Sequence, residues 1–205
     1  MNDYNRIAPF YDRLKKLVFG EQLDLASNYH LSKLTGPAKI LIVGGGTGSI
    51  LTNISSIHSV DYVDQSSNMI DLAKARKFTC DVTFQTSTFE NYDTTLSYDV
   101  IIFPFFLDMF TKKELEDILK KSKQLLKDNG SIHISDFVAK NSGLSVFQKL
   151  LLTSIFVFFR ITTQHRLFKI INTQPLLQKL NFQPVTEKSF VSGMVVASVW
   201  KIDIH

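Results

Sequence analysis

A run of glycines directly after an apolar segment is the feature of this sequence best suited to hold a ligand. The apolar residues 40–43 lead into four glycines, Gly44, Gly45, Gly46 and Gly48. Glycines between a buried strand and a helix let the backbone turn tightly, approach a ligand and direct amide N–H groups at it. Ser49 stands where the dinucleotide fingerprint has its third glycine, and no Gly-Lys-Ser/Thr of a P-loop follows. The loop predicts a nucleotide-type ligand, with a purely structural turn as the alternative.

An acidic residue, Asp64, stands twenty positions beyond Gly44 in the stretch SVDYVDQSSNM. It falls at the carboxyl end of a predicted strand, where ligands gather in open α/β sheets. A carboxylate there can accept both hydrogen bonds of a ribose 2′,3′-diol. Asp61 is the competing candidate, but it lies inside the strand, and we expect it at the sheet edge or the surface. The alternative for Asp64 is a turn or N-cap acid before the next helix.

Short β-branched runs alternate with helical patterns after Gly36 and Pro37, which break the preceding helical periodicity. Strands are expected at 39–44, 56–64, 81–86, 97–105 and 130–137. Helices are expected at 66–77, after a serine N-cap, and at 111–130. The second helix opens with a capping box from Thr111 to Glu114 and closes on Gly130. Strands that alternate with helices imply a doubly wound α/β domain with a parallel sheet covered on both faces.

Both ends of the chain differ from this alternating pattern. Residues 182–202 predict two strands joined by a turn at Ser192 and Gly193, hence an antiparallel hairpin added to the sheet. Residues 1–36 predict an N-terminal helical arm. Its helices are expected at about 9–19 and 21–34.

We expect residues 37–205 to form one domain, into which residues of about 140–175 insert a helical cap. In the stretch LSVFQKLLLTSIFVFFRI, apolar residues occupy nearly every helical face, more than a surface helix needs. One interpretation is a buried cap helix packed on the arm. The other is a lid over an aromatic or lipid-like acceptor, with peripheral membrane contact left open. The apolar run is too short to span a membrane.

Composition favours a single globular domain. With 205 residues, 44% of them hydrophobic, the chain can bury a full core. Its net charge of +4 is spread over separate lysine-containing segments, which usually form solvated helix faces, so we expect no nucleic-acid partner. A single cysteine, Cys80, and an N-terminus without a signal-peptide pattern favour a cytoplasmic location. The oligomeric state is open at this stage.

Four ordered segments resemble the motifs of class I S-adenosylmethionine-dependent methyltransferases. They are ILIVGGGTG, VDYVDQSSNMIDLAK, YDVIIFPFFLDMF and LLKDNGSIHISDF, and the resemblance runs from about Lys39 to Asp136. The phrase YNRIAPFYDRL resembles the opening of the small-molecule branch, which includes methyltransferases of ubiquinone and menaquinone biosynthesis. The resemblance implies a Rossmann-like, mostly parallel sheet with a C-terminal antiparallel hairpin and a helical cap, and S-adenosylmethionine as the cofactor.

The resemblance also implies roles for individual residues. The glycines from Gly44 to Gly48 would pass close to the methionine and ribose of the cofactor, and Asp64 would hold the ribose hydroxyls. The remaining contacts would fall on Gln65 and Met69 beside the adenine, Thr86 and Ser87 at its edge, and Phe103 and Pro104 near the methyl-bearing sulfonium.

Two departures from the family pattern concern acids that are missing here. Ile42 stands where many members carry an acid that orients the glycine loop, and Ser87 stands near the position of an acid that binds the adenine. Either other groups, such as backbone carbonyls or Asp108, hold the cofactor ammonium, or cofactor affinity is reduced. The stretch 103–106, FPFF, lacks the polar first residue of base N-methyltransferases, which disfavours methylation of a nucleobase amine.

Few side chains are candidates for catalysis. Methyl transfer from a sulfonium is an in-line displacement, so the protein mainly aligns the reactants and excludes water, and a base is needed only where the nucleophile carries a proton, as a phenol does. The candidates near the carboxyl edge of the sheet or in its cover are Tyr11, Asp108, Asp136 and His165. His133 is expected to be packed inside a strand. No metal site is predicted, because the histidines lack ligand spacing to carboxylates.

Together these features predict methyl transfer to a hydrophobic small molecule. The acceptor would be phenolic, quinol-like or lipid-like, and methylated on oxygen or carbon. The alternative is a catalytically weak regulatory or scaffolding protein that binds the cofactor. A dinucleotide-dependent reductase is disfavoured by the loop spacing and the closing hairpin.

Overall fold

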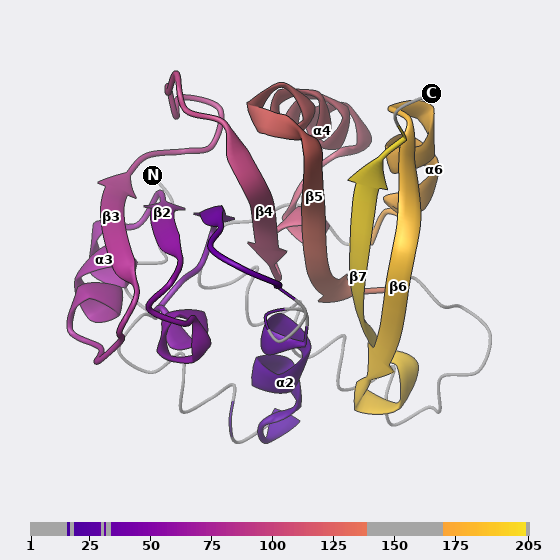
Figure 1. Ribbon diagram of the computed structural model, residues 1–205. Helices are drawn as coiled ribbons and strands as arrows, with labels where there is room; N and C mark the ends of the chain where they lie inside the picture. Colours follow the sequence, from indigo (N-terminus) through magenta and orange to yellow (C-terminus); the bar gives the residue numbers. More distant parts are fainter. Residues whose placement is uncertain (1–15, 17–18, 30, 32–33, 139–169, 204–205) are drawn as a thin grey trace.

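The structure is a computed structural model that describes residues 16, 19–29, 31, 34–138 and 170–203 (Figure 1). Most of the helix expected at 9–19 lies outside the described residues, as does the cap segment up to residue 169. No helix among the described residues is long and apolar enough to cross a membrane.

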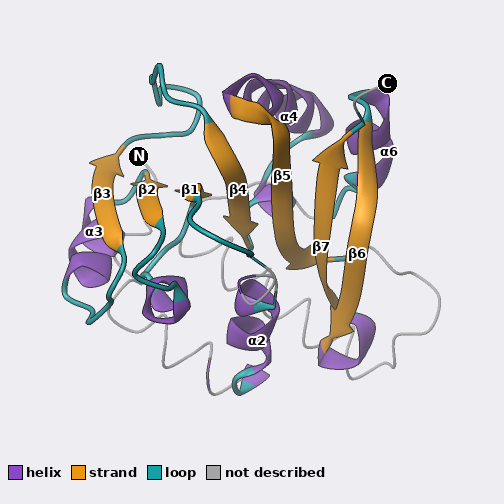
Figure 2. Ribbon diagram, viewed as in Figure 1, coloured by secondary structure: helices purple, strands orange, loops and turns teal. Residues whose placement is uncertain are grey.

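One sheet of seven strands forms the centre of the fold (Figure 2). Its strands are β1 Lys39–Val43, β2 Ser59–Asp64, β3 Asp81–Thr86, β4 Tyr98–Pro104, β5 Leu126–Phe137, β6 Phe182–Phe190 and β7 Val195–Ile202. The order is β3-β2-β1-β4-β5-β7-β6, in which the first five strands are parallel and β7 is antiparallel to both of its neighbours. The predicted doubly wound sheet and its C-terminal antiparallel hairpin are confirmed.

One helix precedes β1, and the other described helices lie in the connections between strands. They are α2 Gln22–Asn28, α3 Ser67–Lys74, α4 Lys112–Leu125 and α6 Gln174–Lys179, with short 3-10 helices η2 Ser49–Asn53, η3 Leu107–Met109 and η4 Val191–Gly193. The predicted serine N-cap is Ser66, whose hydroxyl accepts a hydrogen bond from the Met69 amide. The predicted capping box is also present, because Thr111 and Glu114 satisfy each other's backbone amides.

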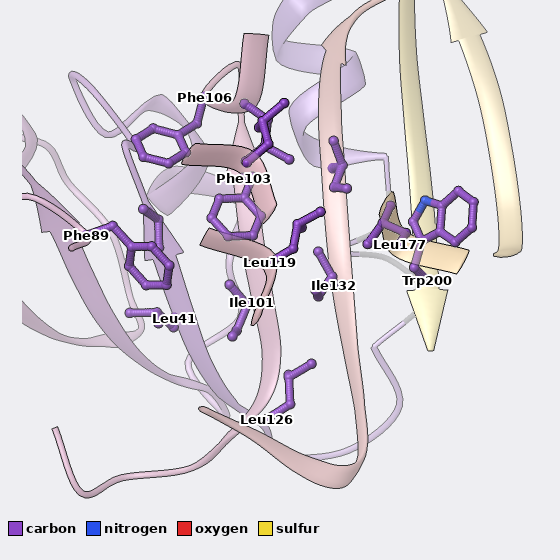
Figure 3. Packing of buried hydrophobic residues seen from close by; sticks show 14 of the residues in the cluster. Leu41, Phe89, Ile101, Phe103, Phe106, Leu119, Leu126, Ile132, Leu177 and Trp200 are labelled. Atoms are coloured by element: carbon purple, nitrogen blue, oxygen red, sulfur yellow. The ribbon is translucent and has the colours of Figure 1, made fainter. Parts of the chain in front are cut away.

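Alternate residues of each strand pack into separate apolar clusters on the two faces of the sheet. Leu41 of β1 joins the cluster under α4 and α6, which also holds Leu119, Leu177 and Trp200 (Figure 3). Its neighbour Ile42 joins the opposite cluster, which contains apolar residues of η2 and α3. This alternation is the period of a strand buried on both faces.

Helix α2 and the hairpin share a third apolar cluster. Ala26 of α2 packs with Phe137 and with residues of β7, and its carbonyl accepts a hydrogen bond of 2.8 Å from the Ser135 hydroxyl. Tyr29 meets Phe190 edge to face at 5.9 Å. Helix α2 therefore packs against the carboxyl end of β5 and against β7. The α-helical part of this segment is shorter than the expected 21–34.

The predicted end of the 111–130 helix is wrong. Helix α4 ends at Leu125, and Leu126 is already extended and pairs with Tyr98 of β4. The register then shifts, so that Val100 pairs with Ser131, and Gly130 lies against Leu126 and the Lys127 carbonyl. Sheet pairing overrides the local glycine stop signal, because this glycine serves a tight irregularity in a strand.

Asp61 was expected at an edge or the surface, and this expectation is wrong. Strand β2 lies between β1 and β3, and Asp61 is buried. Its carboxylate accepts a hydrogen bond of 2.6 Å from the Tyr98 hydroxyl and lies 3.3 Å from Nζ of Lys39. Tyr92 contacts the Tyr98 hydroxyl at 2.6 Å. Burial, followed by the hydrogen bond to Asp61, raises the pKa of Tyr98, so this tyrosine stays protonated and donates.

This network predicts that Tyr98→Phe lowers the free energy of unfolding by about 1–3 kcal/mol, because a buried carboxylate loses its tyrosine donor. Urea unfolding of the purified variant measures the loss. Tyr92→Phe is the matched control, since it leaves the bond between Tyr98 and Asp61 in place and should cost less. Equal losses in both variants would contradict a special role for the Asp61 contact.

Candidate functional site

The glycine loop lies at the point where the strand order reverses. Strand β1 has β2 on one side and β4 on the other, and a crevice at such a reversal is where open α/β sheets bind ligands. The residues after β4 lie against the loop, since a Cβ at Gly44 would overlap the ring of Phe106. The Phe106 ring in turn stacks on Phe103 at 5.7 Å. The candidate site is therefore bounded by the ends of β1, β2 and β4.

The end of β2 holds the glycine loop through three hydrogen bonds. The Gly44 amide donates to the Val63 carbonyl at 2.8 Å. The Gly46 amide donates to Oδ2 of Asp64 at 3.0 Å, and the Gly46 carbonyl accepts from the Tyr62 hydroxyl at 2.9 Å. The loop backbone thus has a defined orientation without any acid in β1.

Two helices hold the remainder of the loop. Arg76, just after α3, donates to the carbonyl and to the hydroxyl of Thr47. The Ser49 hydroxyl donates to Oδ1 of Asp24 in α2 at 3.0 Å, so the arm is tied to the loop. Sequence reasoning missed Tyr62, Arg76 and Asp24, and no local signal could have found them, because each reaches the loop from a distant part of the chain.

Asp64 is buried at the carboxyl end of β2 and anchors two backbone amides. Besides Gly46, it accepts from the Ser66 amide, at 2.9 Å from Oδ1. Burial raises the pKa of Asp64, and the Ser66 and Gly46 amides offset part of that rise. Each carboxylate oxygen has a second lone pair, so the side chain can still accept bonds from a vicinal diol. The residue suits a ribose contact.

The residues expected around an adenine differ in exposure. Gln65 and Thr86 are exposed and Ser87 is half-buried, while Met69 is only 3% exposed. The Ser87 amide donates to the Asp64 carbonyl at 3.0 Å, and its hydroxyl donates to the Thr88 carbonyl. Ser87 therefore lies beside Asp64 with oxygen lone pairs available. The adenine contact expected of Ser87 stays a prediction.

The end of β4 and the residue after it contribute mainly packing. Phe103 is fully buried and meets Phe89 edge to face at 5.9 Å. Its side chain is therefore a core side chain, and only its backbone and the half-buried Pro104 can face a ligand. Phe105 adopts a left-handed conformation with φ 56°, which carries the chain sharply away from the strand.

Ile42 has a clear packing role. It is fully buried in the cluster with Ile102 and pairs in register with Tyr62. A carboxylate in this apolar cluster would incur a large desolvation cost. Ile42 is therefore a core residue of β1, and the loop after it is oriented from β2.

The structure brings together two of the predicted catalytic candidates, Asp108 and Asp136. Oδ2 of Asp136 accepts from the Asp108 amide at 3.0 Å, and Oδ1 accepts from the Phe137 amide at 2.9 Å. Burial raises the pKa of Asp108 to about 6, although the hydrogen bond to Asp136 acts in the opposite direction. Burial, followed by the charge of Asp108, raises the pKa of Asp136 well above its usual value. The pair can retain a shared proton near neutral pH.

A cavity of about 210 Å³ opens beside this acid pair. Its apolar wall includes Ile134, Phe137 and Trp200, and its polar wall includes Ser198 and Glu187. Strands β5, β7 and β6 supply Ile134, Ser198 and Glu187 from one face of the sheet, because Ile134 pairs with Ser198, and Ser198 pairs with Glu187. The Trp200 indole donates to the Ser198 hydroxyl at 3.0 Å. The rest of the lining includes the segment before α6, residues 170–174.

Two of the predicted catalytic candidates cannot be placed in the structure. Tyr11 and His165 lie outside the described residues. His133 is buried, as expected, and its Nε2 lies 3.2 Å from the Ser131 hydroxyl. Among the described residues, no group of three or more histidine, cysteine or acidic side chains is arranged to hold a metal ion.

Residues 40–130 match the family described as "Methyltransferase domain". No curated protein sequence matches the chain.

Solved structures share the fold at low sequence identity. The 1,6-didemethyltoxoflavin-N1-methyltransferase of Burkholderia thailandensis, solved with 1,6-didemethyltoxoflavin and S-adenosylhomocysteine, is 18% identical, with a TM-score of 0.69 over 98% of this chain and 87% of its own. A possible histamine N-methyltransferase of Thermotoga maritima is 18% identical, with a TM-score of 0.67 over 98% of both chains. A Methanosarcina mazei protein described as a SAM-dependent methyltransferase is 17% identical, with a TM-score of 0.62 over 85% of this chain and 96% of its own.

These likenesses establish the fold, and the family match covers the glycine loop, Asp64 and the segment after β4. The strand order and the loop geometry agree with the resemblance seen in the sequence. Residues 40–130 thus match a methyltransferase domain, and the chain has the Rossmann-like methyltransferase fold.

Proposed function

We propose that this protein transfers a methyl group from S-adenosylmethionine to a hydrophobic small molecule bound in the cavity beside Asp108 and Asp136. The observation that carries the proposal is an acid pair with raised pKa values, the buried Asp136 and the half-buried Asp108. It lies on the wall of a cavity whose lining also includes the apolar side chains of Ile134, Val196 and Trp200. The acceptor atom is a phenolic oxygen or an activated ring carbon. The reaction takes place in the cytoplasm, in keeping with Cys80, the single and unpaired cysteine.

The cofactor is held by the loop and by the end of β2. Gly44, Gly46 and Gly48 face its methionine and ribose, Asp64 accepts from the ribose hydroxyls, and Ser87 meets the adenine edge. When bound, the cofactor supplies a methyl group activated by a positively charged sulfur. The protein's own contribution is alignment of the acceptor and exclusion of water.

Asp136 is the candidate base within this proposal. A phenol of pKa about 10 is a weak nucleophile until it begins to lose its proton, and a carboxylate whose pKa is raised accepts a proton more readily than an ordinary one. The Phe137 and Asp108 amides hold both Asp136 oxygens in place. Ile134 and Trp200 form an apolar wall that excludes water from the same space. A proton on the acceptor would pass to the Asp136 carboxylate.

Nitrogen methylation is a second candidate, favoured by the charges of the cavity. Three carboxylates, those of Asp108, Asp136 and Glu187, line it, while none of its described lining residues is a lysine, arginine or histidine. Such a lining favours an acceptor that carries an amine or another hydrogen-bond donor. Two of the structural relatives are named as N-methyltransferases of small nitrogen compounds.

An acceptor screen tests the proposal. The protein is incubated with isotope-labelled S-adenosylmethionine and separate panels of phenols, quinols, amines and lipid extracts, and products are detected by mass spectrometry. Transfer to one panel assigns the acceptor atom. Absence of binding to S-adenosylmethionine and S-adenosylhomocysteine at millimolar concentration would overturn the proposal. Binding without product across all panels would favour the cofactor-binding scaffold instead.

Asp64→Ala is expected to weaken S-adenosylhomocysteine binding by about 1–3 kcal/mol, because charge-assisted hydrogen bonds to the ligand are lost. Calorimetry measures the change. Asp71→Ala, on the exposed side of α3, is the control and should bind like the unmodified protein. An unchanged affinity in Asp64→Ala would move the ribose contact elsewhere.

Asp136→Asn is expected to lower kcat by about 100-fold or more if Asp136 acts as the general base. In the unmodified protein, kcat/KM should fall as the pH drops and Asp136, whose pKa is raised by burial and by the charge of Asp108, becomes protonated. The variant should lack this decline. Asp117→Asn, on α4, serves as the control. A full rate in Asp136→Asn would remove Asp136 from the chemistry.

The acid pair also predicts a pH dependence of stability. The folded protein binds a proton in this pair more tightly than the unfolded chain does, since the pKa of Asp108 rises from 3.8 to about 6. The stabilising contribution of that proton is present below pH 3.8 and is lost as the pH rises through about 6. Thermal melts from pH 4 to 7 should show this loss. Asp136→Asn should flatten the slope, and an equal slope in the variant would contradict the coupling.

A further inference from the structure

The backbone of Gly46 is held from two sides by residues of β2, through the peptide group that precedes its Cα and the one that follows it. Its amide donates to Asp64 Oδ2 at 3.0 Å, and its carbonyl accepts from the Tyr62 hydroxyl at 2.9 Å. Gly46 has φ 61°, and a Cβ at this position would meet no atom within 4 Å. No neighbouring atom contacts Gly46 on that side. The two hydrogen bonds to β2 orient its backbone.

Tyr62 is rigidly placed for this contact. It is fully buried in an interior strand, and its ring lies 5.3 Å from the ring of Phe84 at an angle of 55°. Its ring and hydroxyl also fill the space directly beside Gly45, where a Cβ would overlap them. The side chain thus supports the loop sterically at Gly45 and by a hydrogen bond at Gly46.

We propose that Tyr62 is a positioning residue for cofactor binding, which rests on the proposed function of the loop. The hydrogen bond from Tyr62 directs the Gly46 carbonyl toward the protein interior. With the carbonyl fixed in this way, the Gly46 amide stays in place to donate to Asp64. A glycine-rich loop loses much backbone freedom when it is ordered, so a loop ordered before binding has less entropy to lose when the cofactor arrives.

Tyr62 also acts on Asp64 through Gly46. The bond from the Gly46 amide occupies one lone pair of Asp64 Oδ2, and the Ser66 amide binds Oδ1. If the Gly46 peptide rotates, Asp64 loses one of the two backbone donors that hold its carboxylate. Loss of the Tyr62 hydroxyl should therefore weaken both the loop contact and the acid contact with the ligand.

Tyr62→Phe tests the proposal, because it keeps the ring beside Gly45 and removes only the hydroxyl. We expect the Kd for S-adenosylhomocysteine, measured by calorimetry, to rise by about 3- to 15-fold, the equivalent of one hydrogen bond. Tyr98→Phe is the matched control. It also removes a buried tyrosine hydroxyl, but the partner of that hydroxyl is Asp61, so stability should fall while the Kd stays within twofold.

Amide hydrogen exchange of residues 44–48 without ligand provides an independent measurement. Exchange should accelerate in Tyr62→Phe, and Tyr98→Phe should not change it beyond its effect on global stability. A Kd within twofold of the unmodified protein in Tyr62→Phe, or an equal rise in both variants, would overturn the proposal. If the unmodified protein does not bind S-adenosylhomocysteine, the proposed function fails, while unchanged exchange in Tyr62→Phe refutes loop positioning separately.

Discussion

The hydrogen bond between the Gly46 amide and the Asp64 carboxylate joins the ends of β1 and β2, and the candidate site depends on it. It orders a loop that has little side-chain packing of its own, and it orients the acid expected to meet the ribose. Burial of Asp64 makes this bond stronger than it would be in water, because the local dielectric is low. Tyr62 and Arg76 complete the support from β2 and from the end of α3.

The proposed acceptor cavity depends on the burial of two acids, whereas the loop depends on backbone hydrogen bonds. Asp108 and Asp136 come from the segments after β4 and at the end of β5, and burial places them where two negative charges are unfavourable together. The antiparallel β7 lies beside β5 and adds Ser198 and Trp200 to the same face. The hairpin is therefore part of the cavity wall.

Much of the fold could be predicted from local patterns. The glycine loop, the Ser66 cap, the Thr111 capping box and the closing hairpin each depend on residues close together in sequence. The error at Gly130 arose because a glycine after a helix has two uses, a helix stop or a tight irregularity in a strand. Pairing of Leu126 with Tyr98, far away in the chain, decided between them.

The sequence by itself determined the order of strands and helices along the chain and the position of the glycine loop between β1 and η2, because periodicity, capping and glycine spacing act over a few residues. Only the tertiary structure decided the charge state and partners of the buried acids. Asp61 meets Tyr98, Asp136 meets Asp108, and Tyr62 rather than residue 42 orients the loop. Desolvation and long-range hydrogen bonds depend on which strands become neighbours, and that information is not present in any local pattern.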